Sequence, residues 1–268
     1  MNDRNAKLQN IDLFLFDMDG TLYLGDRLYD FTLELLDTIK KTGRRYMFMT
    51  NNSSKSVADY IKKLARLGIE ATEEEFISSS QATSYYLKKT YPDATLYVCG
   101  TKSLIAELES EGFKVTYNAP EADVIVMGND QELTFKKLED VCRELLTREV
   151  PYVATNLDYV CPTEFGSVPD CGSVCDMIYN CTKKRPFLVG KPEALMPELA
   201  MERTDTPKEK TAVIGDRIYT DVKSGLNAGV LSILVMSGET DEQILSESVD
   251  KPDMVLKDCS EITEALKE

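Results

Sequence analysis

The sequence predicts an α/β fold built on a parallel β-sheet, and two features of the chain predict it. The first is the run Leu13–Phe16, four consecutive apolar residues bounded by acid and glycine. This run is too short for a helix and typical of a strand that is buried on both faces. The second is the alternation of short apolar runs with segments of helical spacing. With 268 residues, the chain exceeds one average domain, so we expect one large or two moderate domains.

The predicted elements follow one another in β-α order. Apolar residues within Leu28–Ile39 recur at helical spacing, and Gly43 closes that segment as a C-cap would. Ser56 and Asp59 resemble the capping box of a second helix. Further strands are predicted at residues 46–49, 76–78, 95–99, 124–127, 152–155, 187–189, 211–215, 231–235 and 254–256. The stretch Asn156–Ser173 is predicted to be irregular, either a functional loop or a surface excursion of a second domain.

Composition excludes several classes of partner. The chain has 31 Lys plus Arg against 46 Asp plus Glu, a net charge of −15, which repels nucleic acid and anionic membrane surfaces. Its apolar runs are shorter than a transmembrane helix, and Met1–Asn10 contains no signal-peptide core. We therefore expect a cytoplasmic protein that binds neither nucleic acid nor membrane.

The chain contains no histidine, which excludes Ser-His-Asp and Cys-His nucleophiles and histidine-ligated metals. Carboxylate or lysine chemistry remains. The seven cysteines are expected to be reduced thiols. Four of them lie in one short segment but lack the paired spacing of structural zinc sites, so we interpret them as core and loop thiols: Cys161, Cys171, Cys175 and Cys181.

Two aspartates follow the first predicted strand. Asp17 and Asp19 lie at the carboxyl end of this strand, where open α/β sheets bind ligands, and Gly20 allows a sharp turn there. Two neighbouring carboxylates repel each other, and a divalent cation or a shared proton relieves the repulsion. The pattern therefore predicts a Mg²⁺ site, with an acidic turn as the alternative.

Polar residues also follow three other predicted strands. Thr50-Asn51-Asn52 comes after residues 46–49 and is equally compatible with helix capping and ligand binding. Lys191 follows residues 187–189, although most lysines are solvated surface residues. Asp216 and Asp221 follow residues 211–215, where the alternative is an acidic helix N-terminus.

Together these motifs resemble the four ordered motifs of the haloacid dehalogenase (HAD) superfamily. They are Asp17-Met18-Asp19-Gly20-Thr21, Thr50-Asn51-Asn52, Gly190-Lys191-Pro192 and Gly215-Asp216-Arg217-Ile218-Tyr219-Thr220-Asp221. The large insertion between the second and third motifs resembles the NagD-like, type IIA phosphatases. This resemblance implies a Rossmann-like core with a parallel sheet, at residues 1–79 and 185–268, and an inserted α/β cap of the C2 type at residues 80–184. The alternative is one continuous sheet, which the long irregular stretch disfavours.

The resemblance also implies a Mg²⁺-dependent phosphomonoester hydrolase. Asp17 would be the nucleophile that forms a phosphoaspartate, and Asp19 would be the general acid and base. Its raised pKa would come from neighbouring carboxylates or the bound dianion. The metal would be held by Asp17, Asp216 and the backbone carbonyl of Asp19, with Asp221 in the surrounding shell. The remaining phosphoryl oxygens would be held by Thr50, Asn51, Asn52 and Lys191.

The cap motifs leave the substrate open. Ala154–Asp158 resembles the cap signature of the family, but Asp170 stands where relatives usually have a glycine, and the cap histidine of some relatives is absent. A small phosphorylated metabolite is implied, such as a sugar phosphate, nucleotide, phosphoglycolate or glycerol phosphate. A phosphotransferase or phosphomutase is the close alternative. A non-catalytic metabolite-binding module is a weaker one, because the catalytic aspartates are all present. Caps of this type often pair, so a homodimer formed through the cap is also implied.

Overall fold

A computed structural model describes residues 3–163 and 165–268 of the chain, without the side chains of Pro162 and Thr163. The chain divides into two compact units. The first unit contains residues 1–50, 60–77 and 191–268, and the second contains residues 51–59 and 78–190. Within the described ranges, the helices lack the length and apolar character that crossing a membrane requires.

The first unit is built on a six-stranded sheet with the order β15-β14-β13-β1-β4-β5. Its strands are β1 (Leu13–Phe16), β4 (Arg45–Thr50), β5 (Phe76–Ser78), β13 (Thr211–Gly215), β14 (Leu231–Val235) and β15 (Met254–Leu256). The central strand β1 pairs in parallel with β13 on one side and β4 on the other, and every side chain of β1 is buried. The predicted α/β fold with a parallel sheet is confirmed.

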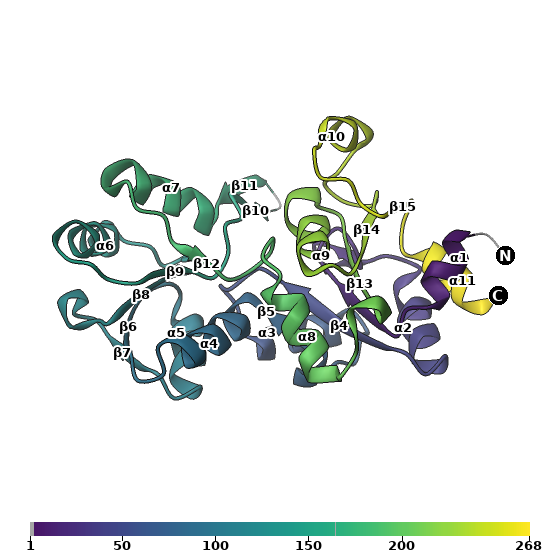
Figure 1. Ribbon diagram of the computed structural model, residues 1–268, viewed down its shortest axis with the longest axis horizontal. Coiled ribbons are helices and arrows are strands. Elements are labelled where there is room, and N and C mark those ends of the chain that lie inside the picture. Colours follow the sequence, from purple (N-terminus) through teal and green to yellow (C-terminus); the bar gives the residue numbers. More distant parts are fainter. Residues whose placement is uncertain (1–2, 164) are drawn as a thin grey trace. The chain divides into compact units, whose positions relative to one another are not determined.

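Helices surround this sheet. They are α1 (Asp3–Gln9), α2 (Thr32–Lys41), α3 (Val57–Arg66), α8 (Leu195–Thr204), α9 (Lys223–Ala228), α10 (Glu242–Glu247) and α11 (Ser260–Lys267). The first and last helices, α1 and α11, lie side by side, and α11 also packs on α2 (Figure 1).

The predicted start of the first helical segment at Leu28 is wrong. Leu28 lies in β3 (Arg27–Leu28), which pairs antiparallel with β2 (Tyr23–Leu24), and α2 begins only at Thr32. The turn of this hairpin contains Gly25 in the left-handed region, with φ +60°. Leu28 therefore matched the helical spacing although it lies in a hairpin strand, next to a tight turn that glycine permits.

The second unit has a separate five-stranded sheet with the order β12-β9-β8-β6-β7, so the alternative of one continuous sheet is wrong. Its strands are β6 (Thr95–Cys99), β7 (Lys114–Thr116), β8 (Val124–Met127), β9 (Tyr152–Ala154) and β12 (Phe187–Leu188), all paired in parallel. Figure 1 shows α4 (Ser79–Thr90) and α5 (Lys102–Ser110) on one face, and α6 (Phe135–Thr147) and α7 (Cys171–Thr182) on the other.

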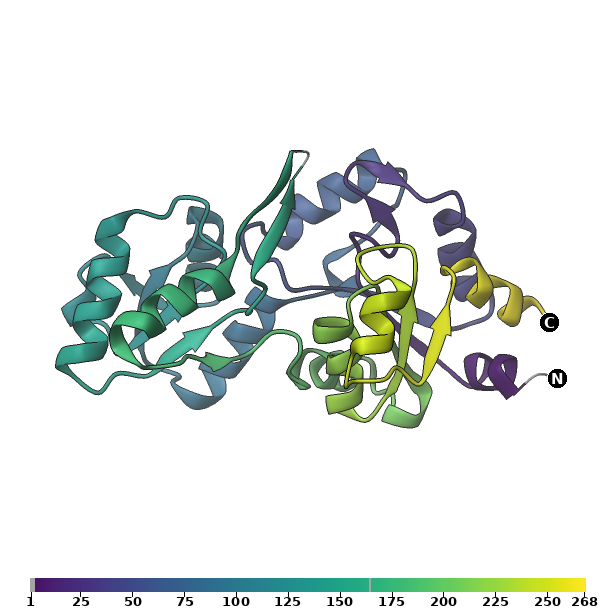
Figure 2. The same ribbon diagram turned by 90° about the horizontal axis from the view of Figure 1, so that it is seen from above.

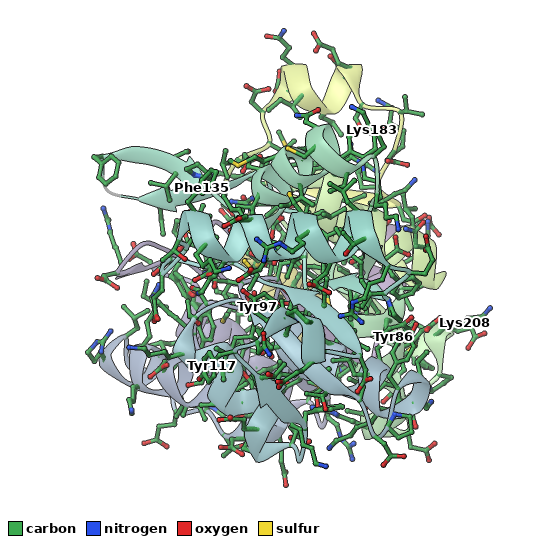
Figure 3. All side chains as sticks on the ribbon, turned by 90° about the vertical axis from the view of Figure 1, so that its left-hand side faces the viewer. Tyr86, Tyr97, Tyr117, Phe135, Lys183 and Lys208 are labelled. Atoms are coloured by element: carbon green, nitrogen blue, oxygen red, sulfur yellow. The ribbon has the colours of Figure 1, made fainter. Side chains whose placement is uncertain are left out.

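Three aromatic side chains of this unit differ in how far they are exposed to solvent. Figure 3 looks onto it from outside and labels Tyr97, Tyr117 and Phe135. Tyr97 is 5% exposed, and its hydroxyl donates to Asp140 of α6 at 3.3 Å. Tyr117 and Phe135 are 80% and 81% exposed. The buried hydroxyl of Tyr97 is thus paired, as a low-dielectric core favours.

The stretch Asn156–Ser173, predicted to be irregular, contains a hairpin and the start of a helix. The strands β10 (Val160–Thr163) and β11 (Gly166–Pro169) pair antiparallel, and α7 begins directly afterwards with Asp170 as its N-cap. Figure 2 shows the hairpin projecting from its unit. Each strand of a two-stranded ribbon has an unpaired edge, where a proline without an N–H is tolerated. The prolines hid this hairpin because they normally argue against strands.

Candidate active site

Three neighbouring strands of the first unit end at the same edge of its sheet. Asp17 follows β1, Asp216 follows β13 and Thr50 is the last residue of β4. The backbone N–H of Asp17 still donates to Ile214 O at 2.8 Å, so the ladder fixes where this carboxylate leaves the sheet. Because parallel strands present their carboxyl ends on one side, side chains that are distant in sequence meet there.

Three aspartates converge at this edge. Asp17, Asp216 and Asp221 each offer a carboxylate oxygen, and these oxygens all lie within 4.8 Å of one another. Over the described residues this is the one such group of acidic or cysteine side chains. Asp216 and Asp221 are 2% and 1% exposed. Buried carboxylates this close match the oxygen ligands that Mg²⁺ prefers.

The pKa values of Asp216 and Asp221 reflect their burial and the charges around them. Burial, followed by the charge of Asp17, raises the pKa of Asp216 to about 6, against the lowering effect of the Glu239 N–H. Burial raises the pKa of Asp221 to about 7, and the Lys191 charge only partly offsets it. The ionised cluster is therefore costly without a cation, and a divalent metal would remove that cost.

Lys191 supplies the positive charge that the protein itself places in this cluster. It is 2% exposed, and its Nζ donates to Asp17 Oδ1 at 2.7 Å, to Asp221 Oδ1 at 2.5 Å and to Met49 O at 3.2 Å. Burial lowers the pKa of Lys191, but the charges of Asp17 and Asp221 outweigh burial and raise it overall. Lys191 is therefore held as an ammonium against both carboxylates.

Asp19 lies apart from the three clustered carboxylates. Its Oδ1 accepts a hydrogen bond from the Gly25 N–H at 3.3 Å, and the carboxyl reaches solvent. Desolvation by the atoms packed around it raises the pKa of Asp19, while the Gly25 N–H and the Lys63 charge lower it. The Asp17 charge adds a smaller increase. We expected neighbouring carboxylates or the bound dianion to raise this pKa, whereas burial is the largest cause.

The remaining predicted phosphate-binding residues follow β4. Thr50 is 6% exposed in the first unit, while Asn51 and Asn52 belong to the second. The carbonyl of Asn51 accepts from Ser79 Oγ at 2.6 Å. Asn52 Oδ1 accepts from the N–H and the hydroxyl of Ser54 at 2.8 and 2.7 Å. The Asn52 side chain therefore closes a turn with Ser54 and does not cap a helix, because α3 begins only at Val57.

A loop that the sequence analysis missed shapes the cluster. The N–H of Glu239 donates to Asp216 Oδ2 at 2.7 Å, and a Cβ at Gly238 would lie 2.1 Å from the same oxygen. Gly20 is equally close on another side, where a Cβ would lie 2.4 Å from Asp216 Oδ2. The available signal was the position of Gly238 three residues after the strand at residues 231–235, at the same sheet edge.

Comparison with known proteins places this site in a family. The chain matches the family model described as haloacid dehalogenase-like hydrolase over residues 14–114, and a HAD-hydrolase-like model over residues 188–262. It is 32% identical to the 5'-nucleotidase YutF of Bacillus subtilis over 248 residues, which cover 92% of this chain and 96% of that protein. The chain belongs to the haloacid dehalogenase-like hydrolases.

Solved structures narrow the assignment within the HAD family. A 4-nitrophenylphosphatase from Thermotoga maritima shares 38% sequence identity with a TM-score of 0.92, covering 97% of this chain and 99% of that one. A glycerol phosphate phosphatase from Mycobacterium tuberculosis, in complex with magnesium, shares 26% identity with a TM-score of 0.88, covering 97% of this chain and 79% of that one. This HAD protein is a NagD-like phosphatase that acts on small phosphorylated substrates.

Proposed function

We propose that the chain is a Mg²⁺-dependent phosphomonoester hydrolase that works through a phosphoaspartate on Asp17. The observation that carries the proposal is the convergence of Asp17, Asp216 and Asp221 around one point, with Lys191 bonded to two of them. A phosphate monoester dianion repels nucleophiles, so such a site needs positive charge on the phosphoryl oxygens and an aligned attacking group.

The metal ligands are proposed to be the carboxylates of Asp17 and Asp216 and the backbone carbonyl of Asp19. Bound there, Mg²⁺ would supply charge neutralisation to the phosphoryl oxygens. Asp221 lies as close to the cluster as the other two and is bonded to Lys191, which fits its predicted role of orienting Lys191 or metal-bound water. The complex of the mycobacterial relative with magnesium supports this choice of metal.

Asp17 is proposed to attack phosphorus, forming a carboxylate O–P bond while the ester P–O bond breaks. Asp19 gives its proton to the leaving alkoxide, and its raised pKa favours the protonated form that this step needs. In the second step Asp19 takes a proton from water, which attacks phosphorus and releases phosphate and free Asp17. The ammonium of Lys191, which lies 2.7 Å from Asp17 Oδ1, is proposed to hold a phosphoryl oxygen together with Thr50, Asn51 and Asn52.

The substrate is proposed to be a small metabolite such as a nucleotide, sugar phosphate, phosphoglycolate or glycerol phosphate. The names of relatives span this range, from a 5'-nucleotidase to a glycerol phosphate phosphatase. We propose that the second unit acts as the cap, as predicted for residues 80–184. A homodimer formed through the cap and a cytoplasmic location stay predictions.

The test is hydrolysis of p-nitrophenyl phosphate with Mg²⁺ and with a chelator. Asp17→Asn should lower kcat by about 10⁴-fold or more because it removes the nucleophile. Asp12→Asn is the matched control, since Asp12 precedes the same strand at its opposite end and is exposed. A wild-type protein that is inert with Mg²⁺ on a panel of phosphate esters would refute the hydrolase.

The phosphotransferase alternative is tested in the same assay. An added alcohol competes with water for the phosphoryl group, so p-nitrophenol release is compared with inorganic phosphate release. A hydrolase gives equal amounts of both products. A transferase gives less phosphate than p-nitrophenol and a new phosphate ester.

A further inference from the structure

Two of the points where the chain passes between its compact units adjoin proposed phosphate-binding residues. One passage is Thr50–Asn51, and the other is Gly190–Lys191. Ser53 lies three residues after Thr50, and Gly190 directly precedes Lys191. Within the second unit, Ser53 and Gly190 both contact one residue, Thr155.

Thr155 follows β9 and is completely buried. Its N–H donates to Met127 O at 2.8 Å, which ties it to the neighbouring strand β8, and its carbonyl accepts from the Gly190 N–H at 2.9 Å. Its Oγ1 lies 2.8 Å from Ser53 Oγ and 2.9 Å from Asn156 Oδ1. The backbone of Thr155 therefore binds Gly190, which belongs to one passage. Its side chain binds Ser53, two residues beyond the other passage.

Ser53 is also completely buried, and its Oγ accepts from the Asn129 N–H at 3.0 Å. The single proton of the Thr155 hydroxyl is directed to Ser53 Oγ at 2.8 Å, with Asn156 Oδ1 as a second acceptor at 2.9 Å. The network continues to two buried carboxylates, because Asn156 Nδ2 donates to Asp158 Oδ2 at 3.1 Å and to Asp170 Oδ1 at 3.2 Å. Deleting one hydroxyl would leave a buried partner without its hydrogen bond.

Close packing joins the two passages as well. A Cβ at Gly190 would lie 2.4 Å from Thr155 O and 2.6 Å from Asn51 Oδ1, so only glycine allows this approach. On its other side Asn51 is held through its carbonyl by Ser79. The segment that follows Thr50 and the segment that precedes Lys191 are therefore fixed to each other through Thr155.

We propose that Thr155 is a positioning residue for phosphoryl binding, fixing the segment that carries Asn51 to Gly190, the residue that leads to Lys191. The inference rests on the proposed function, because Asn51 and Lys191 are proposed there to hold phosphoryl oxygens. Small displacements of groups that hold a reacting phosphoryl group weaken binding and alignment. Thr155 itself contacts no reacting atom in this proposal.

The experiment compares Thr155→Val, which keeps the shape and removes the hydroxyl, with Thr155→Ser, which keeps the hydroxyl. Thr155→Val should raise KM for p-nitrophenyl phosphate and Ki for inorganic phosphate together, by about 3- to 10-fold. Thr155→Ser should restore both values to within about twofold. The control is Thr182→Val, which deletes another buried threonine hydroxyl of this unit, bonded to Ile178 O at 2.9 Å.

Hydrogen exchange gives a readout that does not depend on activity. The amides of Asn129 and of residues 51–55 should exchange faster in Thr155→Val than in Thr182→Val. Ser53→Ala deletes the same contact from its other side and should reproduce both effects if Thr155→Val does not fold.

Equal KM, Ki and exchange in Thr155→Val and Thr182→Val would overturn the inference. If the wild type hydrolyses no phosphate ester with Mg²⁺, the proposed function fails instead. The exchange measurement then still decides whether Thr155 fixes the two segments.

Discussion

The two parallel sheets of this phosphatase bury carboxylates beyond their strand ends in different surroundings. In the first unit the carboxyl ends of β1 and β13 lead to buried aspartates and Lys191, a cluster with more negative than positive charge. In the second unit the chain beyond β8 and β9 supplies Asn129 and Asn156, whose side-chain amides donate to the buried carboxylates of Asp158 and Asp170. The same architecture therefore places carboxylates against an ammonium group in one unit and against side-chain amides in the other.

This difference explains why the aspartate cluster of the first unit, and not the hydrogen-bonded network of the second, indicates a metal-binding function. A buried carboxylate that accepts hydrogen bonds from amide groups is compensated in part without a cation. A buried carboxylate cluster is not, because each ionised member raises the energy of the others until a cation binds. Burial, followed by the charge of Asp17, raises the pKa of Asp216 to about 6, so the ionised form is disfavoured without a cation.

The largest expected effect is on the change in Tm that Mg²⁺ causes, which should depend on the carboxylate cluster and not on the Thr155 network. Asp216→Asn removes a proposed ligand and one negative charge, so it should abolish the rise in Tm that Mg²⁺ gives the wild type. In chelator its Tm should equal or exceed that of the wild type, because the crowded charge is gone. Thermal unfolding with and without Mg²⁺ measures this. Asp12→Asn and Thr155→Val should keep the Mg²⁺ response, and a full response in Asp216→Asn would refute the metal site.

A smaller effect is expected from the loop that holds Asp216. In Gly238→Ala the new methyl group would meet Asp216 Oδ2 at 2.1 Å, so the carboxylate must move. Mg²⁺ affinity, measured by titration calorimetry, should fall by about 10- to 100-fold. Glu239→Gln is the control, because the bond to Asp216 comes from the backbone N–H, which this change retains. Unchanged affinity in Gly238→Ala would show that the loop does not set the ligand position.

The smallest expected effect is a shift in pH dependence. The Lys63 charge lowers the pKa of Asp19, and Lys63→Gln should therefore raise that pKa. A general acid must be protonated, so activity is lost as pH rises through its pKa. The basic limb of the kcat profile should move to higher pH in Lys63→Gln, with Lys62→Gln, its neighbour on α3, as the control. A shift to lower pH would contradict the assignment of Asp19 as the acid.

The sequence predicted the sheet of each unit well because buried parallel strands are continuous apolar runs. Residues 95–99, 124–127, 211–215 and 231–235 form strands with the predicted bounds. The predictions were wrong where a local sequence pattern favoured a different structure. Leu28 matched a helical spacing although it lies in the β2–β3 hairpin. The prolines of the β10–β11 hairpin argued against strands there.

The candidate site was predictable in its residues but not in its connections. Acidic residues at strand ends pointed to Asp17 and Asp216 because chemistry of this kind needs charged groups. Gly238 carries no functional group, and its role arises only from the space it leaves beside Asp216. Thr155 is likewise a common buried residue, and its partners Ser53 and Gly190 are separated from it by long stretches of sequence.

One measurement tests the central claim most directly, and it uses Asp19→Asn with p-nitrophenyl phosphate and Mg²⁺. Because p-nitrophenolate leaves without much help from an acid, this variant should slow the water step more than the attack by Asp17. We predict a burst of p-nitrophenol equal in amount to the protein and, after acid quenching, a phosphoryl group on the peptide that contains Asp17. Turnover without a burst, or a phosphoryl group on another residue, would contradict the account.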